Sequence, residues 1–138
     1  MDEINPLLQG YPEPPPSCSK KVFCIAGIRL WVYGLDELTD TTDVVCLWLL
    51  HPRLLTQMNM EPLAFSTIHA WHSHAAQHYN HRFRPGMIAA SFDQRNHGSR
   101  EIEPRANEAW RSGNETHAQD MFSIYRSLLI KTFPVSTD

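Results

Sequence analysis

The sequence predicts an α/β protein whose sheet is antiparallel in its first part and parallel beyond it. Three observations support this prediction. Residues 21–35 are rich in β-branched and aromatic side chains, with an Ala26–Gly27 pair near their middle. Two later runs, residues 44–50 and 87–92, are apolar at almost every position, which is typical of strands buried on both faces. A segment with helical periodicity separates these runs, as a parallel connection requires.

The composition is that of one globular domain. The chain has 138 residues, of which 42% are hydrophobic and 20% are charged. Residues 1–19 contain "YPEPPPS", and we expect a flexible, proline-rich leader there. Residues 20–138 are expected to form a single domain. The formal net charge of -3, without a basic cluster, argues against nucleic acid as a partner.

The sequence also predicts a cytoplasmic protein. It begins Met-Asp-Glu and shows no signal peptide, and its longest apolar run is far below the roughly 20 residues of a membrane span. Its three cysteines are an odd number without C-x-x-C spacing, which favours reduced thiols. Cys24 and Cys46 fall in predicted strands, where we expect them to be buried and to act as small hydrophobes.

The elements follow in order along the chain. Residues 21–35 are expected to form a hairpin of two strands or one long bent strand, and the acidic segment 36–43 to form a loop. The strand at 44–50 stops at His51–Pro52. The next strand, at 87–92, ends at Asp93, and the polar segment 94–113 is expected to be a loop. A last helix is expected to begin after Asn114.

The long helix between the two apolar strands is predicted to begin near Asn59 as its cap, with Glu61 and Pro62 in its first turn. At 3.6 residues per turn, five apolar side chains share one face, and we expect that face to pack on the sheet. They are Phe65, Ile68, Trp71, Ala75 and Tyr79.

Two polar segments follow the apolar strands, at the edge of an α/β sheet where ligands gather. They are "HPRLLTQ" at 51–57 and "DQRNHGSR" at 93–100. The stretch "SFDQRNHGSR" resembles the segment of the α/β-hydrolase superfamily in which a strand leads into Asp, x, Arg, a small or polar residue, His and Gly. "LLHPR" is similar to the position of the oxyanion loop in those enzymes. "GNETHAQDMFSIY" is similar to a segment of uncharacterised fungal hydrolase-like proteins.

The resemblance covers roughly residues 21–125 and implies the N-terminal half of an α/β-hydrolase sheet: an antiparallel hairpin, then parallel strands flanked by helices. Those enzymes need a Ser in G-x-S-x-G, then an acid and a His. None of the six glycines here is followed by Ser two positions later and Gly four positions later. The resemblance is lost after Tyr125, so we expect a truncated relative of serine esterases, lipases and peptidases.

We therefore assign no catalytic residue and expect the chain to be inactive alone, with the substrate left open. The alternative is a small non-enzymatic α/β module for protein interaction. The resemblance implies an open edge on the last strand, where the nucleophile strand would lie. We expect self-association or pairing through such an exposed edge.

The candidate site residues follow from the two polar segments, and each set has two readings. The first set can be read as an oxyanion region, or its His can simply end a strand. Pro52 contributes no N–H, so at least one donor expected of an oxyanion loop is absent. It consists of His51, Arg53 and Leu54. The second set either rims an active site or is structural, with its Asp and Arg fastening the strand end and its Gly supplying a turn. It consists of Asp93, Arg95, Asn96, His97 and Gly98.

A histidine-rich stretch raises the question of a metal. His74 and His78 have the i, i+4 spacing that can hold a zinc ion, with His81 on the same side of the helix. No H-E-x-x-H pattern or convincing further ligand accompanies them. We therefore expect a solvated helix face, with neither a metal nor a cofactor.

Overall fold

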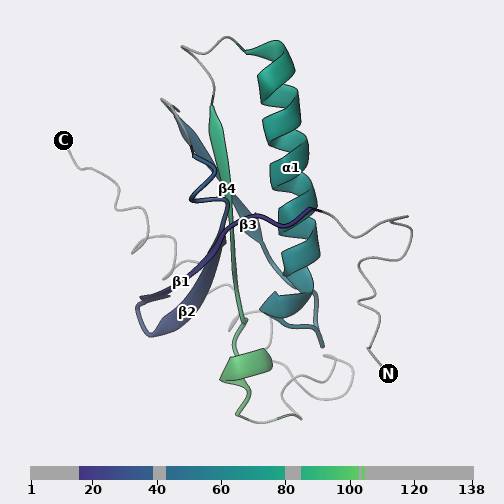
Figure 1. Cartoon of the computed structure of the whole chain (residues 1–138). Coiled ribbons are helices and arrows are strands. Elements are labelled where there is room, and N and C mark those ends of the chain that lie inside the picture. Colours follow the sequence, from purple (N-terminus) through teal and green to yellow (C-terminus); the bar gives the residue numbers. More distant parts are fainter. Residues whose placement is uncertain (1–15, 39–42, 80–84, 103, 105–138) are drawn as a thin grey trace, which may run out of the picture.

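The protein forms one four-stranded sheet with a long helix against one of its faces (Figure 1). This computed structural model describes residues 16–38, 43–79, 85–102 and 104. The strands are β1 (Lys20–Ile25), β2 (Ile28–Tyr33), β3 (Val44–Leu49) and β4 (Gly86–Phe92), the helix is α1 (Glu61–His78), and two short 3-10 turns are η2 (Gln57–Met60) and η3 (Gly98–Arg100). The predicted α/β class is confirmed, whereas most of the predicted leader and the helix after Asn114 lie outside the described residues.

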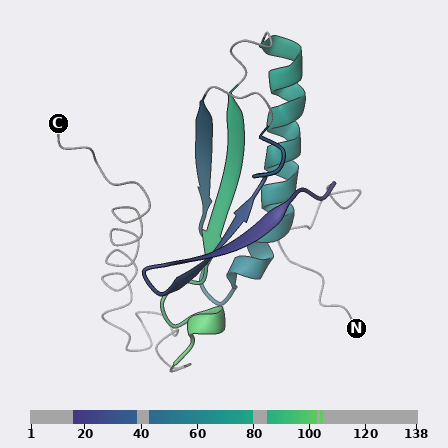
Figure 2. The ribbon, with the colours of Figure 1, turned by 60° about the vertical axis from the view of Figure 1, so that its left-hand side comes forward.

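The first two strands form the predicted hairpin. Their register runs to the Ile25↔Ile28 pair, so that only Ala26 and Gly27 make the turn. Both have positive φ, 55° and 77°, which is the two-residue turn whose twist matches that of paired strands. The sheet twist carries the hairpin across the direction of the two parallel strands, as Figure 2 shows.

The sheet order is β1-β2-β4-β3, with β2 antiparallel to β4 and β3 parallel to β4. The parallel pair is joined through α1, as the sequence predicts. The later strand inserts between the hairpin and β3, so β4 has a partner on both sides. The expectation of an open edge on the last strand is therefore wrong. In the described sheet, the outer strand of the parallel pair is β3, and its outer edge is the open one.

Side chains on both faces of the sheet are buried. On the face of α1, the core contains Tyr33, Leu49, Met60, Ala64, Ile68 and Ala89. The opposite face buries Ile28, Leu30, Val32, Ala90 and Phe92. The alternation along β2 divides its side chains between the two groups. An edge-to-face aromatic pair packs on each face of the sheet. Tyr33 contacts Phe65 on the face of α1, and Trp48 contacts Phe92 on the opposite face, with ring centroids 5.8 Å and 6.1 Å apart.

The helix begins one residue later than predicted. Met60 is the cap of α1, and Glu61 and Pro62 lie in its first turn. Asn59 has a different role, since its side-chain oxygen accepts the backbone N–H of Thr56 at 2.9 Å and closes the turn η2. The polar side chain thus serves the 3-10 turn that precedes the helix.

The predicted apolar face of α1 is largely confirmed. Ile68 and Ala75 are fully buried, and Trp71 is half-buried with its indole N–H donating to the carbonyl of Pro85 at 3.0 Å. Tyr79 is 44% exposed, so its predicted place in the core is wrong. It follows the last helical residue with extended φ and ψ, and therefore leaves the helix face. Among the described residues, no helix is both long enough and apolar enough to cross a bilayer.

The two apolar strands differ in burial. Six of the seven residues of β4 are buried, as predicted. In β3, by contrast, Val44 and Val45 are 48% and 43% exposed, so the prediction of burial on both faces is wrong there. Cys24 is exposed and Cys46 only half-buried, against the expectation for both. The common reason is position, because β1 and β3 are the outer strands of the described sheet.

Candidate functional site

The two predicted polar segments meet at the carboxyl ends of β3 and β4. These strands are parallel neighbours, so the residues that follow them lie side by side. The rings of His51 and His97 are 5.3 Å apart between centroids. His51, Asp93 and His97 expose only 1%, 3% and 2% of their surface, which is unusual for such polar side chains. We refer to His51, Gln57, Asp93, Gln94 and His97, all buried, as the polar cluster.

The ring of His51 has a partner at each nitrogen. Its Nδ1 lies 3.0 Å from the carbonyl oxygen of Pro52, and its Nε2 accepts the backbone N–H of Gln94 at 3.0 Å. A nitrogen that accepts an N–H carries no proton, so the proton must be on Nδ1 and the ring is neutral. Burial is the main reason that the pKa of His51 is lowered, and the neighbouring His97 adds to the effect. The 4.0 Å distance from Nε2 to Asp93 is accordingly not an ion pair.

The carboxylate of Asp93 joins two loops. It accepts the backbone N–H of Gln57 at 2.8 Å from the loop after β3. It also accepts the backbone N–H and the hydroxyl of Ser99, each at 2.8 Å, from η3. Bonds to an ionised acceptor are among the stronger hydrogen bonds in proteins. Asp93 therefore fastens the end of β4 to both loops, and Arg100 adds a bond from its guanidinium to the Asp93 carbonyl at 3.0 Å.

The other residues predicted together with Asp93, from Arg95 to Gly98, form the turn that follows β4. Gly98 has φ +51°, and a Cβ atom there would lie 2.4 Å from an Asp93 carboxylate oxygen. Asn96 has φ +60°, and its side-chain oxygen accepts the backbone N–H of Ile102 at 2.7 Å. Arg95 is exposed, whereas His97 turns inward with its Nδ1 2.9 Å from the Arg95 carbonyl. The glycine is required here both by conformation and by space.

The predicted oxyanion region divides between interior and surface. His51 is buried, while Arg53 is exposed and the Leu54 side chain is 70% exposed. Leu54 has φ +69°, a conformation that is strained for a residue with a branched side chain. The backbone N–H of Gln57, further along the same loop, is already bound to Asp93. The oxyanion role stays a prediction.

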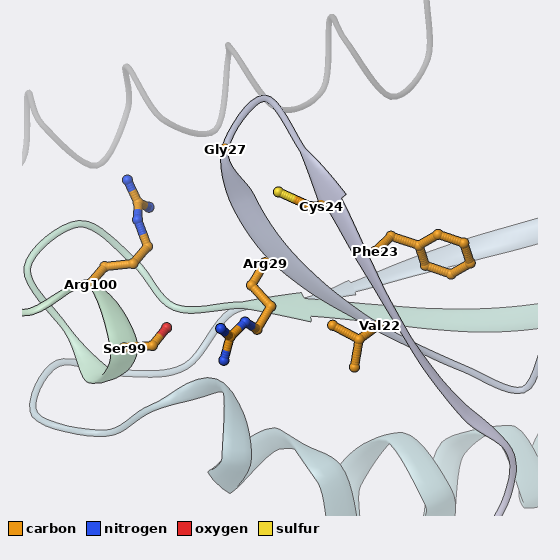
Figure 3. A pocket seen from close by; sticks show the side chains of 7 residues that line it. All are labelled: Val22, Phe23, Cys24, Gly27, Arg29, Ser99 and Arg100. Atoms are coloured by element: carbon orange, nitrogen blue, oxygen red, sulfur yellow. The ribbon is translucent and has the colours of Figure 1, made fainter.

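Two adjoining hollows lie between the hairpin and the polar cluster. The first has a volume of about 330 Å³ and is lined by Arg29, Trp31, Thr56, Gln57, Met58, Asp93, Gly98 and Ser99. The second has a volume of about 380 Å³ and is lined by Val22, Phe23, Cys24, Gly27, Arg29, Ser99 and Arg100 (Figure 3). Arg29 and Ser99 line both hollows. These two volumes fall within the range of small-molecule sites.

The polar cluster and the neighbouring Ser99 bring Ser, Asp and His together, but not in the arrangement of a serine hydrolase. In a triad, the His lies between the Ser and the acid and removes the proton of the Ser. Here the carboxylate of Asp93 lies between the Ser and the His. It accepts a hydrogen bond from the Ser99 hydroxyl on one side and is 4.0 Å from His51 Nε2 on the other. Since Nε2 is occupied by the N–H of Gln94, it has no place for the Ser99 proton. This Ser is not activated as a nucleophile.

Neither Cys18 nor Cys46 offers a better nucleophile. Burial, together with the charge of Glu37, raises the pKa of the Cys18 thiol to about 11. Burial also raises the pKa of the Cys46 thiol. The reactive form of cysteine is the thiolate, so both side chains stay in their unreactive form near neutral pH.

The histidines of α1 lie apart from the polar cluster. The rings of His74 and His78 lie 4.2 Å apart between centroids, tilted by 35°, on the exposed face of the helix. His81, the third predicted member of this row, lies outside the described residues. Within the described part of the chain, no group of three or more His, Cys, Asp or Glu side chains could hold a metal ion.

Four residues of the site were not among the candidates predicted from the sequence: Gln57, Gln94, Ser99 and Arg100. Three of these lie within the quoted "DQRNHGSR" segment and Gln57 ends the quoted "HPRLLTQ" segment, so the two polar segments were the available signal. Gln57 contacts Asp93 across 36 positions of the sequence, and no local pattern indicates such a pair. Comparison of the chain with protein-family models, with curated proteins and with solved structures gives no match.

Proposed function

We propose that the chain is a non-catalytic, α/β-hydrolase-like interaction module that pairs with a second copy of itself along the outer edge of β3. The hydrolase-like part of the proposal is supported by the arrangement of the sheet. An antiparallel hairpin is followed by a parallel pair joined through a helix, as the resemblance implies. The polar segments follow β3 and β4, where the resemblance locates the oxyanion loop and the Asp-x-Arg-x-His-Gly element.

The chemistry of the polar cluster supports a non-catalytic role. A hydrolase of this kind needs a Ser on a strand-to-helix turn with a His able to accept its proton. The sequence has no G-x-S-x-G, and both nitrogens of His51 are engaged with backbone groups. The cluster instead fixes the ends of two parallel strands to the loops that follow them. Its role in this proposal is to hold β3 in position.

The observation that carries the proposal is the chemistry of β3 as an edge strand. Within the described residues, no strand pairs with its outer side. Proteins usually protect such edges with charged residues, Pro or a bulge. The sequence of β3, VVCLWL, contains none of these residues, and Val44 and Val45 are about half exposed. The other edge strand, β1, begins with Lys20 and Lys21 and thus carries the charges that β3 lacks.

The same chemistry favours a second copy of the chain as the partner. Two β3 strands can pair about a two-fold axis, because such an interface brings the same patch together from both subunits. An apolar, uncharged strand meets no repulsion from its own copy and offers no charge pattern to select another partner. The paired sheet would cover the exposed faces of Val44 and Val45 and satisfy the outward N–H and C=O groups of β3.

Sedimentation equilibrium of the full chain tests this proposal with one variant and one matched control. Val45→Lys places a charge on β3, and like charges brought together across the two-fold axis should raise the dimer Kd by about tenfold or more. Val22→Lys places the same charge on β1, where the valine is 56% exposed, and should leave the Kd unchanged. A monomer at every concentration, or equal effects of the two variants, would rule out pairing through β3.

An independent assay tests the non-catalytic part. The chain should neither hydrolyse 4-nitrophenyl acetate faster than its His51→Leu variant nor become labelled by a fluorophosphonate, which reacts with activated serines. Stoichiometric labelling of Ser99 would show that the hydroxyl is activated and would overturn this part, whatever the state of assembly.

A further inference from the structure

The hollow between the hairpin and η3 has the composition of a site for an anion. It lies beside the turn of the hairpin, with β1 and β2 on one side and η3 on the other (Figure 3). Among the described residues that line it, Arg29 and Arg100 are cationic and none is acidic. Its volume of about 380 Å³ is sufficient for a small organic molecule.

Arg29 is a lining cation for which the described part of the chain provides no ion-pair partner. Nearby, Lys20 forms an ion pair with Glu61, and Lys21 pairs with Asp36. Among the described residues, none forms a hydrogen bond or ion pair with the Arg29 guanidinium. Figure 3 shows this side chain extending from β2 toward Ser99. Because a guanidinium presents five N–H donors, Arg29 can bind a carboxylate or phosphate with two parallel bonds.

Arg100 supplies a second, fixed positive charge on the opposite wall. Its Nη1 donates to the carbonyl of Asp93 at 3.0 Å, which holds the side chain at the end of β4. The side chain is half-buried, so its charge is less screened than that of a fully exposed residue. A preorganised cation of this kind attracts an anion without having to be ordered at the moment of binding.

Part of the remaining wall is apolar, which favours an anion that has an apolar body. Val22 and Phe23 are exposed on β1, at 56% and 43%, and both line the hollow. We infer that this groove binds a small organic anion, with its carboxylate or phosphate on Arg29 near Arg100 and its apolar body against Val22, which lies on the same side of the hairpin as Arg29 (Figure 3). This site is separate from the edge of β3, so the proposal does not depend on self-association.

Titration of the full chain, followed by amide NMR, tests the inference with three probes: octanoate, inorganic phosphate and 1-octanol. Octanoate should bind saturably and shift the amides of Arg29, Ser99 and Arg100, whereas the other two probes should not. Arg29→Gln should weaken octanoate binding by about tenfold or more, since it removes a bidentate ionic contact. Arg53→Gln is the matched control, because it removes the charge of an exposed arginine that lines neither hollow.

The results separate the possible readings. Octanol that binds as tightly as octanoate would show an apolar patch only, and phosphate that binds as tightly would show a bare cation site; either result overturns the inference. Equal loss of binding in the two variants, or no saturable octanoate binding at all, also overturns it. Unchanged thermal midpoints in both variants would confirm that the comparison concerns binding and not folding. Arg29→Lys should retain part of the affinity, because it keeps the charge but loses the two-pronged geometry.

Discussion

The backbone N–H of Gln94 donates to Nε2 of His51 at 3.0 Å, across 43 positions of the sequence. This bond connects the loop after β4 to the residue that follows β3 and fixes the protonation state of the ring. The side-chain amide of Gln94 returns a second bond to the carbonyl of His51. The two residues thus form a closed pair inside the polar cluster, and its loss should be measurable as a change in stability.

Replacement of His51 by Leu should lower the free energy of unfolding by about 2 kcal/mol or more, because the buried N–H of Gln94 loses its acceptor. Urea denaturation followed by tryptophan fluorescence measures this change. His69→Leu is the control, since His69 is exposed on α1 and should change stability little. Equal effects of the two substitutions would mean that the bond between His51 and Gln94 contributes nothing to stability.

The neutral state of His51 predicts a dependence of stability on pH. Burial lowers the pKa of His51 in the folded protein below its ordinary value of 6.5. The unfolded chain therefore binds more protons than the folded one below that pH, so stability must decrease as the solution is acidified. The decrease should begin near pH 6.5 and reach at most about 1.4 kcal/mol per pH unit, until the lower pKa of the folded state is passed.

Urea midpoints of the wild type and of His51→Leu, measured over the same pH series, separate this contribution from those of other titrating groups. The difference in unfolding free energy between the two proteins should shrink as the pH falls below about 6.5. A difference that stays constant with pH would show that His51 does not titrate in this way.

Asp93→Asn should destabilise the protein by about 3 kcal/mol, since bonds to an ionised acceptor are the stronger ones and the new amide has donors of its own. Those donors would face the N–H groups of Gln57 and Ser99. Thermal unfolding measures the change, with Asp36→Asn as the exposed control. The side chain of Asp36 is 60% exposed, so its ion pair with Lys21 should contribute little. A loss in Asp93→Asn no larger than in the control would exclude Asp93 as the fastening residue.

The parts of the fold that were predictable depend on local chemistry. The turn at Ala26–Gly27 was visible because a glycine between two apolar runs is a short-range signal. The strand β4 was recognised by its continuous apolar run and is buried as expected. The run in β3 has the same appearance, yet Val44 is half exposed. Apolar content indicates a strand, but it does not tell a central strand from an outer one, because strand order is set by long-range pairing.

The same limit applies to the site. Asp93 and Gly98 were identified because they stand together in one polar segment after a strand. The bond between Gln57 and Asp93 was not, although Gln57 ends the other polar segment, because it spans 36 positions of the sequence; Arg29 was not identified either, because it reaches the site from β2. The helix start shows a further limit, because Asn59 has the residue type of a cap but bonds within the preceding turn. Side-chain chemistry indicates a capacity for a contact, and the fold selects the contact that is made.

Gly98 and Gly27 allow the contact between glycine and carboxylate to be measured separately from backbone strain. Both have positive φ, 51° and 77°, so alanine at either position should lose about 1 kcal/mol from conformation alone. At Gly27 nothing lies within 4 Å of the added Cβ, whereas at Gly98 the Cβ would lie 2.4 Å from the Asp93 carboxylate. Gly98→Ala must therefore also displace a side chain that holds two loops, and its total loss should be about 3 kcal/mol. Urea denaturation of the two alanine variants gives the comparison. Equal losses would mean that the carboxylate moves aside freely, and Asp93 could then not be the rigid connection between β4 and its neighbouring loops.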